Sequence, residues 1–453
     1  MTTATEITGA TATEIAGSVR ALAARGELRP GDALPPVRAL AEHLGLNRNT
    51  VVAAYRQLAQ AGVVVARGRT GTRIADRARV AQEGFAPDAR EGLAPGTREA
   101  VVPGALLRDV GTGNPDPDLI PDLAAALGRI AGRPVLYGEP VIEPGLADWA
   151  DEWMREALDP ALPVRLTITS GASDGVERLL AQTLTRGDAV ALEDPCFLTS
   201  MNTVRLGGYR AVPVPVDAEG MTVAGLRDAL GAGVRAVVCT PRAQNPTGAS
   251  LSAERAAALR EVLADHPYAL VIEDDHFSML SAQPYRSLIG PGHRRWALIR
   301  SVSKFLGPDM CLAVVASDPE TADTLALRLR PGTAWVSHLL QRLAHLQLTD
   351  PAALARIRAA GSHYAERNAA FARLMRDRGL PTDAGDGLST WVRLPVPARG
   401  VAERLLHRGW LARAGDEFVL ADPAAASCLR LTVHALDDAH QARLADDLVA
   451  AMG

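Results

Sequence analysis

The chain has 453 residues, of which 48 are basic and 52 acidic, and its formal net charge at pH 7 is −4. An apolar fraction of 47% with 22% charged residues is ordinary for a soluble globular protein, and it excludes wholesale disorder, collagen-like repeats and fibrous coiled coils. The small net charge also argues against a general polyanion binder or a membrane-surface protein, and the length allows two or three domains.

Only one of the 48 basic residues is a lysine, Lys304, and the other 47 are arginines. Arginine stays protonated at any working pH, whereas a lysine with a lowered pKa can act as a nucleophile or form a Schiff base. Composition alone leaves two interpretations of Lys304 open, an accidental surface residue and a residue retained for its amine.

The chain shows no sign of membrane or secretory targeting. It has no run of about eighteen apolar residues, and its N-terminus lacks a basic stretch followed by an apolar one. The cysteines lie far apart without a C-x-x-C pair, which argues against a zinc site or a disulfide framework. We therefore expect a cytoplasmic protein without a membrane span or a bound metal.

The N-terminal residues form a locally basic segment. Residues 1–74 hold nine arginines and five acidic residues. The spacing of Ile15, Val19 and Leu22 predicts a first helix. We further predict a helix over 36–44 that ends at Gly45, a helix over 48–61 that Asn47 caps, and strands over 63–66 and 72–74 that flank a basic hairpin tip.

A helix, a turn, a second helix and a basic β-wing can place a recognition helix in the major groove of DNA and the wing on its backbone. Residues 28–74 resemble the winged helix of GntR-type bacterial transcription regulators throughout. By this resemblance, the residues that contact a double-stranded DNA operator are Arg38, Arg48, Asn49, Thr50, Arg69 and Gly71. The alternative is that these side chains form the solvated face of a protein-interaction module.

Composition and patterning divide the chain into three parts. Residues 1–75 form the expected DNA-binding domain, and residues 76–108, which carry Gly, Pro, Ala and mixed charge without periodicity, form a linker. From residue 109 to residue 453, short apolar runs alternate with helical segments, with a large part to about 340 and a smaller part from about 341. Strands are predicted at 165–169, 189–192, 236–239, 269–272 and 296–299.

This alternation predicts an α/β domain with a mostly parallel sheet, in which ligands bind at the carboxyl ends of the strands. The segments after the predicted strands contain residue types that often bind ligands. They include a Gly-rich helix start after the first strand, which suits a phosphate, and an aromatic residue after the second. The later segments are 240–248 with Gln244 to Gly248 (QNPTG), 272–277 with Glu273 to Asp275 (EDD), and 300–305 with Lys304.

Together these groups suit one ligand. Pyridoxal 5′-phosphate (PLP) has a phosphate, a flat ring, a ring nitrogen that pairs with a carboxylate, a phenolic oxygen and an aldehyde that reacts with an amine. About 340 residues resemble the fold-type I aminotransferases, with QNPTG, EDD and SVSK in that family's order and spacing.

The resemblance implies a role for each residue. Lys304 would hold PLP as a Schiff base, Asp274 would pair with the pyridine nitrogen, Asn245 would bond the ring's O3′ and Phe197 would stack on the ring. The phosphate would be lined by Gly171, Ala172, Ser301 and Ser303. Tyr137 would reach the phosphate of a neighbouring subunit, which implies a homodimer, and Arg430 would grip the carboxylate of an amino acid or other amino compound.

Two positions depart from the aminotransferase pattern. An arginine that clamps the phosphate is expected seven or eight residues after the lysine, where this chain has Cys311 and Leu312. Losing such a contact would cost about 1.5–3 kcal/mol, or roughly ten- to a hundredfold in affinity. His276 and Phe277 stand where a tyrosine is expected beside O3′. These departures predict either weak cofactor binding or a site adapted to sensing.

A GntR-type winged helix, a linker and an aminotransferase-like domain in one chain resemble the MocR-type regulators, which include the PdxR-like ones. The resemblance implies a PLP-responsive transcriptional regulator that acts as a homodimer on DNA. Two alternatives stay open. One is a working aminotransferase with a DNA-binding appendage, and the other is a regulator whose second domain has lost PLP and only dimerises.

Overall fold

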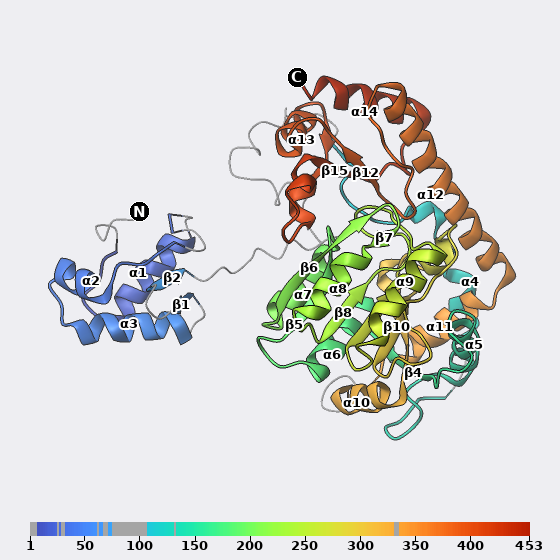
Figure 1. The fold of residues 1–453 in the computed structure, drawn as a ribbon, viewed down its shortest axis with the longest axis horizontal. Coiled ribbons are helices and arrows are strands. Elements are labelled where there is room, and N and C mark those ends of the chain that lie inside the picture. Colours follow the sequence, from blue (N-terminus) through green and yellow to red (C-terminus); the bar gives the residue numbers. More distant parts are fainter. Residues whose placement is uncertain are drawn as a thin grey trace. The chain divides into compact units, whose positions relative to one another are not determined.

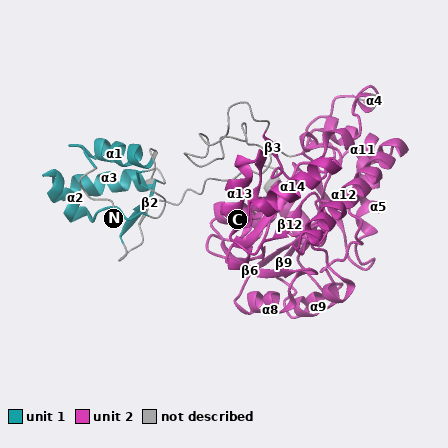
Figure 2. Ribbon diagram, turned by 90° about the horizontal axis from the view of Figure 1, so that it is seen from above, with its two compact units in different colours: residues 1–81 teal, residues 82–453 magenta. Residues whose placement is uncertain are grey.

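The computed structural model describes residues 7–24, 27–28, 32–60, 63–66, 71–74, 107–130, 133–329 and 335–453. The chain forms two compact units, residues 1–81 and residues 82–453 (Figure 2). Most of the expected linker and the predicted wing residue Arg69 lie outside the described residues.

The described part of the small unit contains three helices and a two-stranded antiparallel sheet, as the sequence predicts. These elements are α1 (Ala12–Ala24), α2 (Val37–Leu44), α3 (Arg48–Gln60), β1 (Val64–Ala66) and β2 (Thr72–Ile74). The predicted apolar stripes meet in one core, where Val19, Leu40 and Leu58 are fully buried.

Two residues between the helices explain where α2 and α3 end and begin. Gly45 follows α2 with φ +67°, a left-handed conformation that glycine adopts without strain. The side chain of Asn47 accepts a hydrogen bond from the backbone N–H of Asn49 at 2.9 Å, which confirms the predicted N-cap of α3.

The large unit is built on an eight-stranded sheet in the order β4-β11-β10-β9-β8-β5-β6-β7 (Figure 1). The pairs from β10 through β9, β8 and β5 to β6 are parallel, whereas β11 runs antiparallel to both of its neighbours. The sheet is therefore mixed rather than wholly parallel. Its strands are β4 (Arg165–Thr169), β5 (Ala189–Asp194), β6 (Arg210–Asp217), β7 (Gly220–Met221), β8 (Ala236–Cys239), β9 (Leu270–Asp274), β10 (Trp296–Ser301) and β11 (Ala313–Ser317).

Alternate residues of the central strands enter two different apolar cores, one on each face of the sheet. In β10, Trp296 and Leu298 pack in one core, and Ala297 and Ile299 pack in the other. Helices cover both faces, so the strands are buried on both sides and read as continuous apolar runs. The helices are α4 (Ala124–Leu127), α5 (Pro144–Arg155), α6 (Ala172–Thr183), α7 (Leu198–Leu206), α8 (Val223–Gly231), α9 (Ala253–Ala264), α10 (Pro319–Leu329), α11 (His338–Leu348) and α12 (Pro351–Asp377).

The C-terminal part has a smaller sheet of its own, in the order β12-β15-β14. The long helix α12 reaches from the large sheet to this part (Figure 1), with Tyr364 in the first core and Phe371 in the second. A short strand after the linker, β3 (Arg108–Asp109), pairs with β13. The remaining elements are β12 (Thr390–Arg393), α13 (Ala398–His407), β13 (Trp410–Leu411), β14 (Arg413–Ala414), β15 (Cys428–Leu431) and α14 (Asp438–Ala450).

Among the described residues, none of the helices combines the length and the apolar character that crossing a membrane requires.

Candidate functional site

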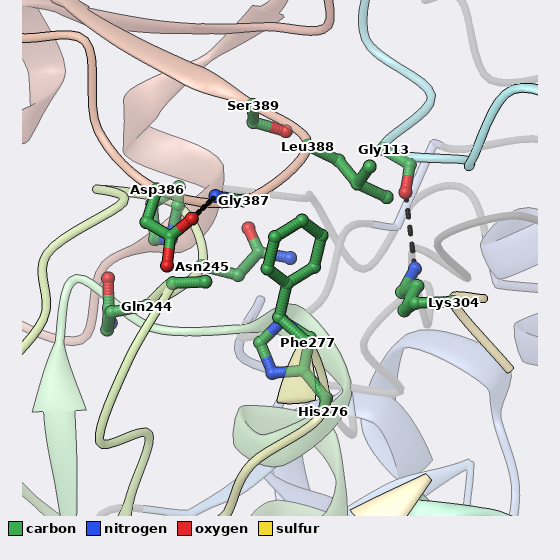
Figure 3. Close-up of a pocket in the computed structure, with 12 residues that line it drawn as sticks. Gly113, Gln244, Asn245, His276, Phe277, Lys304, Asp386, Gly387, Leu388 and Ser389 are labelled. Carbon is green, nitrogen blue, oxygen red and sulfur yellow. Dashed lines mark hydrogen bonds between the residues drawn. The ribbon is translucent and has the colours of Figure 1, made fainter. Parts of the chain in front are cut away.

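A cavity lies beyond the carboxyl ends of β8, β9 and β10, where the sequence predicts the chemistry. It is partly open, and the empty space between its lining atoms, including space open to solvent, is about 310 Å³. Three predicted site residues, Asn245, His276 and Lys304, line it together with Gly113 (Figure 3). Each of the three follows a different strand, so the parallel strand directions bring them together.

Asp274 and Lys304 interact electrostatically beside this cavity. Burial and the neighbouring Asp275 raise the pKa of Asp274 to about 7, while the charge of Lys304 opposes that rise. Burial lowers the pKa of Lys304, and the charge of Asp274 opposes this effect. Oδ1 of Asp274 is buried and accepts no hydrogen bond from any described residue. The site therefore combines an amine of lowered pKa with a carboxyl group whose Oδ1 has no hydrogen-bond donor among the described residues.

The Lys304 amine donates a hydrogen bond to the backbone oxygen of Gly113 at 3.2 Å (Figure 3). Gly113 belongs to the segment Gly111–Asp116, which we call the strap. It comes directly after β3. Four further hydrogen bonds join the strap to residues of the C-terminal part and of α12, involving Arg430, Thr432, His434 and Tyr364.

The turn that is expected to hold a phosphate lies at the start of α6. Gly171 precedes the helix with φ +92°, which strains any residue with a side chain, and a Cβ there would meet no atom closer than Sγ of Cys311 at 4.0 Å. Ala313 of β11 pairs with both Thr169 and Ser301, so the ends of β4 and β10 lie on either side of β11.

Cys311 lies at this turn, and two predicted phosphate-site serines lie at the end of β10. The hydroxyl groups of Ser301 and Ser303 lie 3.1 Å apart. The exposed thiol of Cys311 lies 3.4 Å from the backbone oxygen of Ser170. Cys311 therefore occupies the place beside the turn where the aminotransferase pattern puts an arginine.

Arg430, on β15, is fully buried and is held by neutral acceptors. It donates hydrogen bonds to the backbone oxygen of Gly111 at 2.6 Å and to Oδ1 of Asn245 at 3.3 Å, and its guanidinium lies 4.8 Å from the ring centre of Phe418. Burial lowers its pKa to about 9. The contact with Asn245 places this guanidinium next to a residue of the cavity.

The other predicted cofactor and effector residues do not line the cavity; these are Asp274, Gly171, Ala172, Ser301, Ser303, Arg430, Phe197 and Tyr137. Phe197 is half-buried at the residue before α7. Tyr137 is 93% exposed, with its ring 5.4 Å from that of Trp335. Neither placement tests its expected role, which for Tyr137 concerns a second subunit.

The predicted DNA-contacting residues lie on the surface of the small unit. Arg38 on α2 and Arg48 and Asn49 in the first turn of α3 are exposed, and Thr50 is half-buried. Gly71, just before β2, is exposed and has φ +86°, which suits the tight end of a β-wing. The first turn of α3 therefore presents a basic, polar surface.

Both units match known families, and two curated proteins resemble nearly the whole chain. Residues 11–74 match the bacterial regulatory proteins of the gntR family, and residues 109–448 match the aminotransferases of class I and II. The chain is 45% identical over 443 residues to the vitamin B6 salvage pathway transcriptional repressor PtsJ of Salmonella typhimurium, with 98% of both chains covered. It is 30% identical over 447 residues to the transcriptional regulator TauR of Rhodobacter capsulatus, with 88% of this chain and 87% of that protein covered.

The chain belongs to the MocR-type family of GntR regulators. A solved structure agrees with the fold of the regulator's large unit. The aminotransferase LysN of Thermus thermophilus superimposes with a TM-score of 0.67 at 23% identity, covering 82% of this chain and 98% of LysN. At that identity the likeness concerns the fold alone.

Several residues of this MocR-type regulator's site have no obvious signal in its sequence. Asp386, Gly387, Leu388 and Ser389 line the cavity from the loop before β12, more than eighty residues after Lys304. The strap has only the turn-like composition of Gly111 to Asp116, which indicates a loop but not its position. Arg242 and Arg300, which bind Asp275 in the interior, look like ordinary arginines in an arginine-rich chain.

Proposed function

We propose that the chain is a PLP-responsive transcriptional regulator, in which PLP binding at the large unit changes the affinity of the small unit for operator DNA. The observation that carries this proposal is the electrostatic interaction of Lys304, the chain's only lysine, with Asp274, whose buried Oδ1 accepts no hydrogen bond from any described residue. The 45%-identical relative is named as a repressor of vitamin B6 salvage, the pathway that PLP itself belongs to.

The residues present fit PLP. A buried carboxyl oxygen without a partner suits the pyridine nitrogen, and the pKa of Asp274 lies close enough to neutrality for the group to be ionised by a cationic partner. The Gly171 turn leaves open space at the start of α6, where backbone N–H groups and the helix dipole favour a phosphate. Asn245 and His276 lie on the cavity where the phenolic oxygen is expected.

PLP supplies an aldehyde that condenses with an amine and a ring that draws electrons from the bond formed. Lys304 would offer its half-buried amine, and Asp274 would keep the ring nitrogen protonated. Ser301, Ser303, Gly171 and Ala172 would bind the phosphate without an arginine, and Phe197 would cover one face of the ring.

The strap offers a physical route from the site to the linker. Lys304 donates a hydrogen bond to the backbone oxygen of Gly113. If PLP is held by Lys304, this amine would no longer be free to donate to Gly113, and a carboxylate bound by Arg430 would compete with Gly111 for the guanidinium. Both events would change the hydrogen bonds that fix the strap, and the strap follows the linker in the sequence. A ligand that favours one strap position thereby shifts the regulator toward one DNA affinity.

The functional unit in this proposal is a homodimer with the exposed Tyr137 at the phosphate of the neighbouring subunit. Arg430 would bind the carboxylate of an amino compound that acts together with PLP. Operator contacts come from Arg38, Arg48, Asn49, Thr50, Arg69 and Gly71.

The buried guanidinium of Arg430, 3.3 Å from Asn245, favours a second candidate function, that of an active aminotransferase. The test is steady turnover of an amino donor and a keto acid by PLP-loaded protein. Turnover that Lys304→Ala abolishes supports this candidate, and its absence over a panel of amino acids argues against it.

The proposed function is tested by a PLP titration of the wild type, Lys304→Ala and Lys304→Arg, followed by the absorbance of the lysine-bound cofactor. We expect a saturable new band for the wild type and none for either variant, because arginine keeps the charge but offers no free amine. An unchanged wild-type spectrum would support the alternative in which the second domain has lost PLP and serves only for dimerisation.

A further inference from the structure

A buried ion cluster lies behind the predicted cofactor residues. The carboxylate of Asp275 accepts two hydrogen bonds from Arg242, at 2.7 Å from Nε and 2.9 Å from Nη2, and one from Nε of Arg300 at 2.9 Å. Asp275 is 0% exposed, Arg242 8% and Arg300 4%. Such a cluster is held in a fixed geometry because each charge is hydrogen-bonded in a medium of low dielectric.

Each member of the cluster is close in sequence to a different predicted PLP contact. Asp275 follows Asp274 directly, Arg242 stands three residues before Asn245, and Arg300 stands four residues before Lys304. The cluster therefore ties together the carboxyl ends of β8, β9 and β10. The two arginines are themselves anchored, since Nη1 of Arg242 donates to the backbone oxygen of Gln283 and Nη1 of Arg300 to that of Trp153.

We propose that Asp275 is a positioning residue that, clamped by Arg242 and Arg300, fixes the end of β9 where Asp274 stands and sets the charge of Asp274. The inference rests on the proposed function, because Asp274 acts there on the ring nitrogen of PLP. Asp275 itself touches neither the cavity nor its ligand.

The electrostatics follow from the arrangement. Asp275 raises the pKa of Asp274, and the two arginines limit that effect because they neutralise Asp275. Burial alone would raise the pKa of Asp275, but the hydrogen bonds and charges of Arg242 and Arg300 lower it, so Asp275 stays ionised. Removing Asp275 leaves an excess of positive charge near Asp274, whereas removing Arg242 leaves an excess of negative charge.

Other charged groups near Asp274 belong to four elements. Burial foremost, with the charge of Lys304, lowers the pKa of His276 to about 4, so this ring is neutral near pH 7. Glu273 is bound by Ser287 and by the backbone N–H of Leu288, and on α6, which packs against β9, Asp174 pairs with Arg178. Of the charged groups on these elements, Asp275 and Lys304 act on the pKa of Asp274, Asp275 raising it and Lys304 lowering it.

The test measures the protonation of Asp274 in the full-length, cofactor-free protein by pH-difference infrared spectroscopy, with the band assigned by its loss in Asp274→Asn. Asp275→Asn should lower the protonation midpoint of Asp274 by about one pH unit, and Arg242→Gln should raise it by about one. Each variant removes one neighbouring charge, and a shift of this size is typical of such a change. Arg242→Lys, which keeps the charge, should leave the midpoint near that of the wild type.

The opposite signs separate this role from a structural one. Both variants break the cluster, so both lower the thermal unfolding midpoint. Only an effect of the cluster's charge on Asp274 would shift the protonation midpoint of Asp274 in opposite directions in the two variants. Shifts of the same sign, or none, would overturn the proposal. If Asp275→Asn does not fold, Arg242→Gln decides alone, since a rise supports the proposal and an unchanged midpoint refutes it.

A PLP titration of the same proteins tests the proposed function separately from the role of Asp275. Asp275→Asn should retain PLP binding to a lower pH than the wild type, and Arg242→Gln should lose it at a higher pH. A wild type that binds no PLP would refute the proposed function, while the infrared measurement still decides the role of Asp275.

Discussion

Asp274 is buried, and its Oδ1 accepts no hydrogen bond from any described residue, so its ionised form costs stability when no cofactor is bound. Its folded-state pKa is about 7 against an ordinary 3.8, so stability is lost as pH rises from about 4 through 7. Asp274→Asn has no charge to bury. We expect it to stabilise the cofactor-free large unit at pH 8 by on the order of 1–3 kcal/mol, with no gain near pH 4.

Thermal unfolding of both proteins at pH 4 and pH 8 checks this expectation. The same variant should bind PLP more weakly, so that stability and function move in opposite directions. A variant that is less stable than the wild type at pH 8 would show that Asp274 is satisfied by groups other than a ligand.

Cys311 sits where an arginine would bind the phosphate, with its thiol next to Ser170 and Gly171. Cys311→Arg should tighten PLP binding about tenfold, since one charge-assisted hydrogen bond contributes about 1.5 kcal/mol or more. Cys311→Ser is the control, because it changes the thiol without adding charge. Equal dissociation constants for wild type and Cys311→Arg would mean that the phosphate binds elsewhere.

At the level of elements, the strap connects the site to the start of the large unit. Thr432 accepts a hydrogen bond from the backbone N–H of Gly113 at 3.0 Å. Thr432→Val should remove this hydrogen bond to the strap while Lys304 and Asp274 stay in place. We expect PLP affinity within about threefold of the wild type, because no predicted cofactor contact is lost, and a smaller effect of PLP on DNA affinity.

Fluorescence anisotropy with labelled operator DNA measures that effect. The matched control is Thr382→Val, a buried threonine whose hydroxyl bonds the backbone oxygen of Leu380, away from the strap. If Thr432→Val responds to PLP as fully as the wild type does, the strap does not transmit the signal.

Elements with a strong local signal could be predicted from the sequence. The apolar stripes of α1 to α3 and the apolar runs of β4, β5, β8, β9 and β10 appear at or within two or three residues of their expected bounds. The residues after these strands could be predicted to meet, because parallel strands bring their carboxyl ends to one edge.

Features that depend on contacts between distant segments could not be predicted. The antiparallel β11 is a short apolar run like its parallel neighbours, and nothing local sets its direction. The strap meets β15 and the residues after it across more than three hundred positions. A buried Arg242 in an arginine-rich chain has no local mark that separates it from a surface arginine.

At the scale of the whole molecule, the role of Tyr137 can be tested by mixing two defective chains. Tyr137→Ala should bind PLP weakly and Lys304→Ala should form no bond with it. If Tyr137 serves the neighbouring subunit, a heterodimer has one complete site, made of Lys304 from one chain and Tyr137 from the other.

Co-expression with two different affinity tags isolates such a heterodimer, and absorbance measures its PLP binding. We expect half of the wild-type sites at wild-type affinity. A heterodimer whose affinity only matches that of Tyr137→Ala would place Tyr137 outside the site of its partner.

The most direct test of the account is the affinity of the full chain for DNA from its own upstream region, measured with and without PLP. Arg48→Ala serves as the control for specific DNA binding, and Lys304→Ala as the control for the cofactor. We predict that PLP changes the wild-type affinity by about fivefold or more, the usual scale of coupling between two sites, and leaves Lys304→Ala unchanged. Equal wild-type affinities in the two conditions would contradict the proposal that this regulator senses PLP.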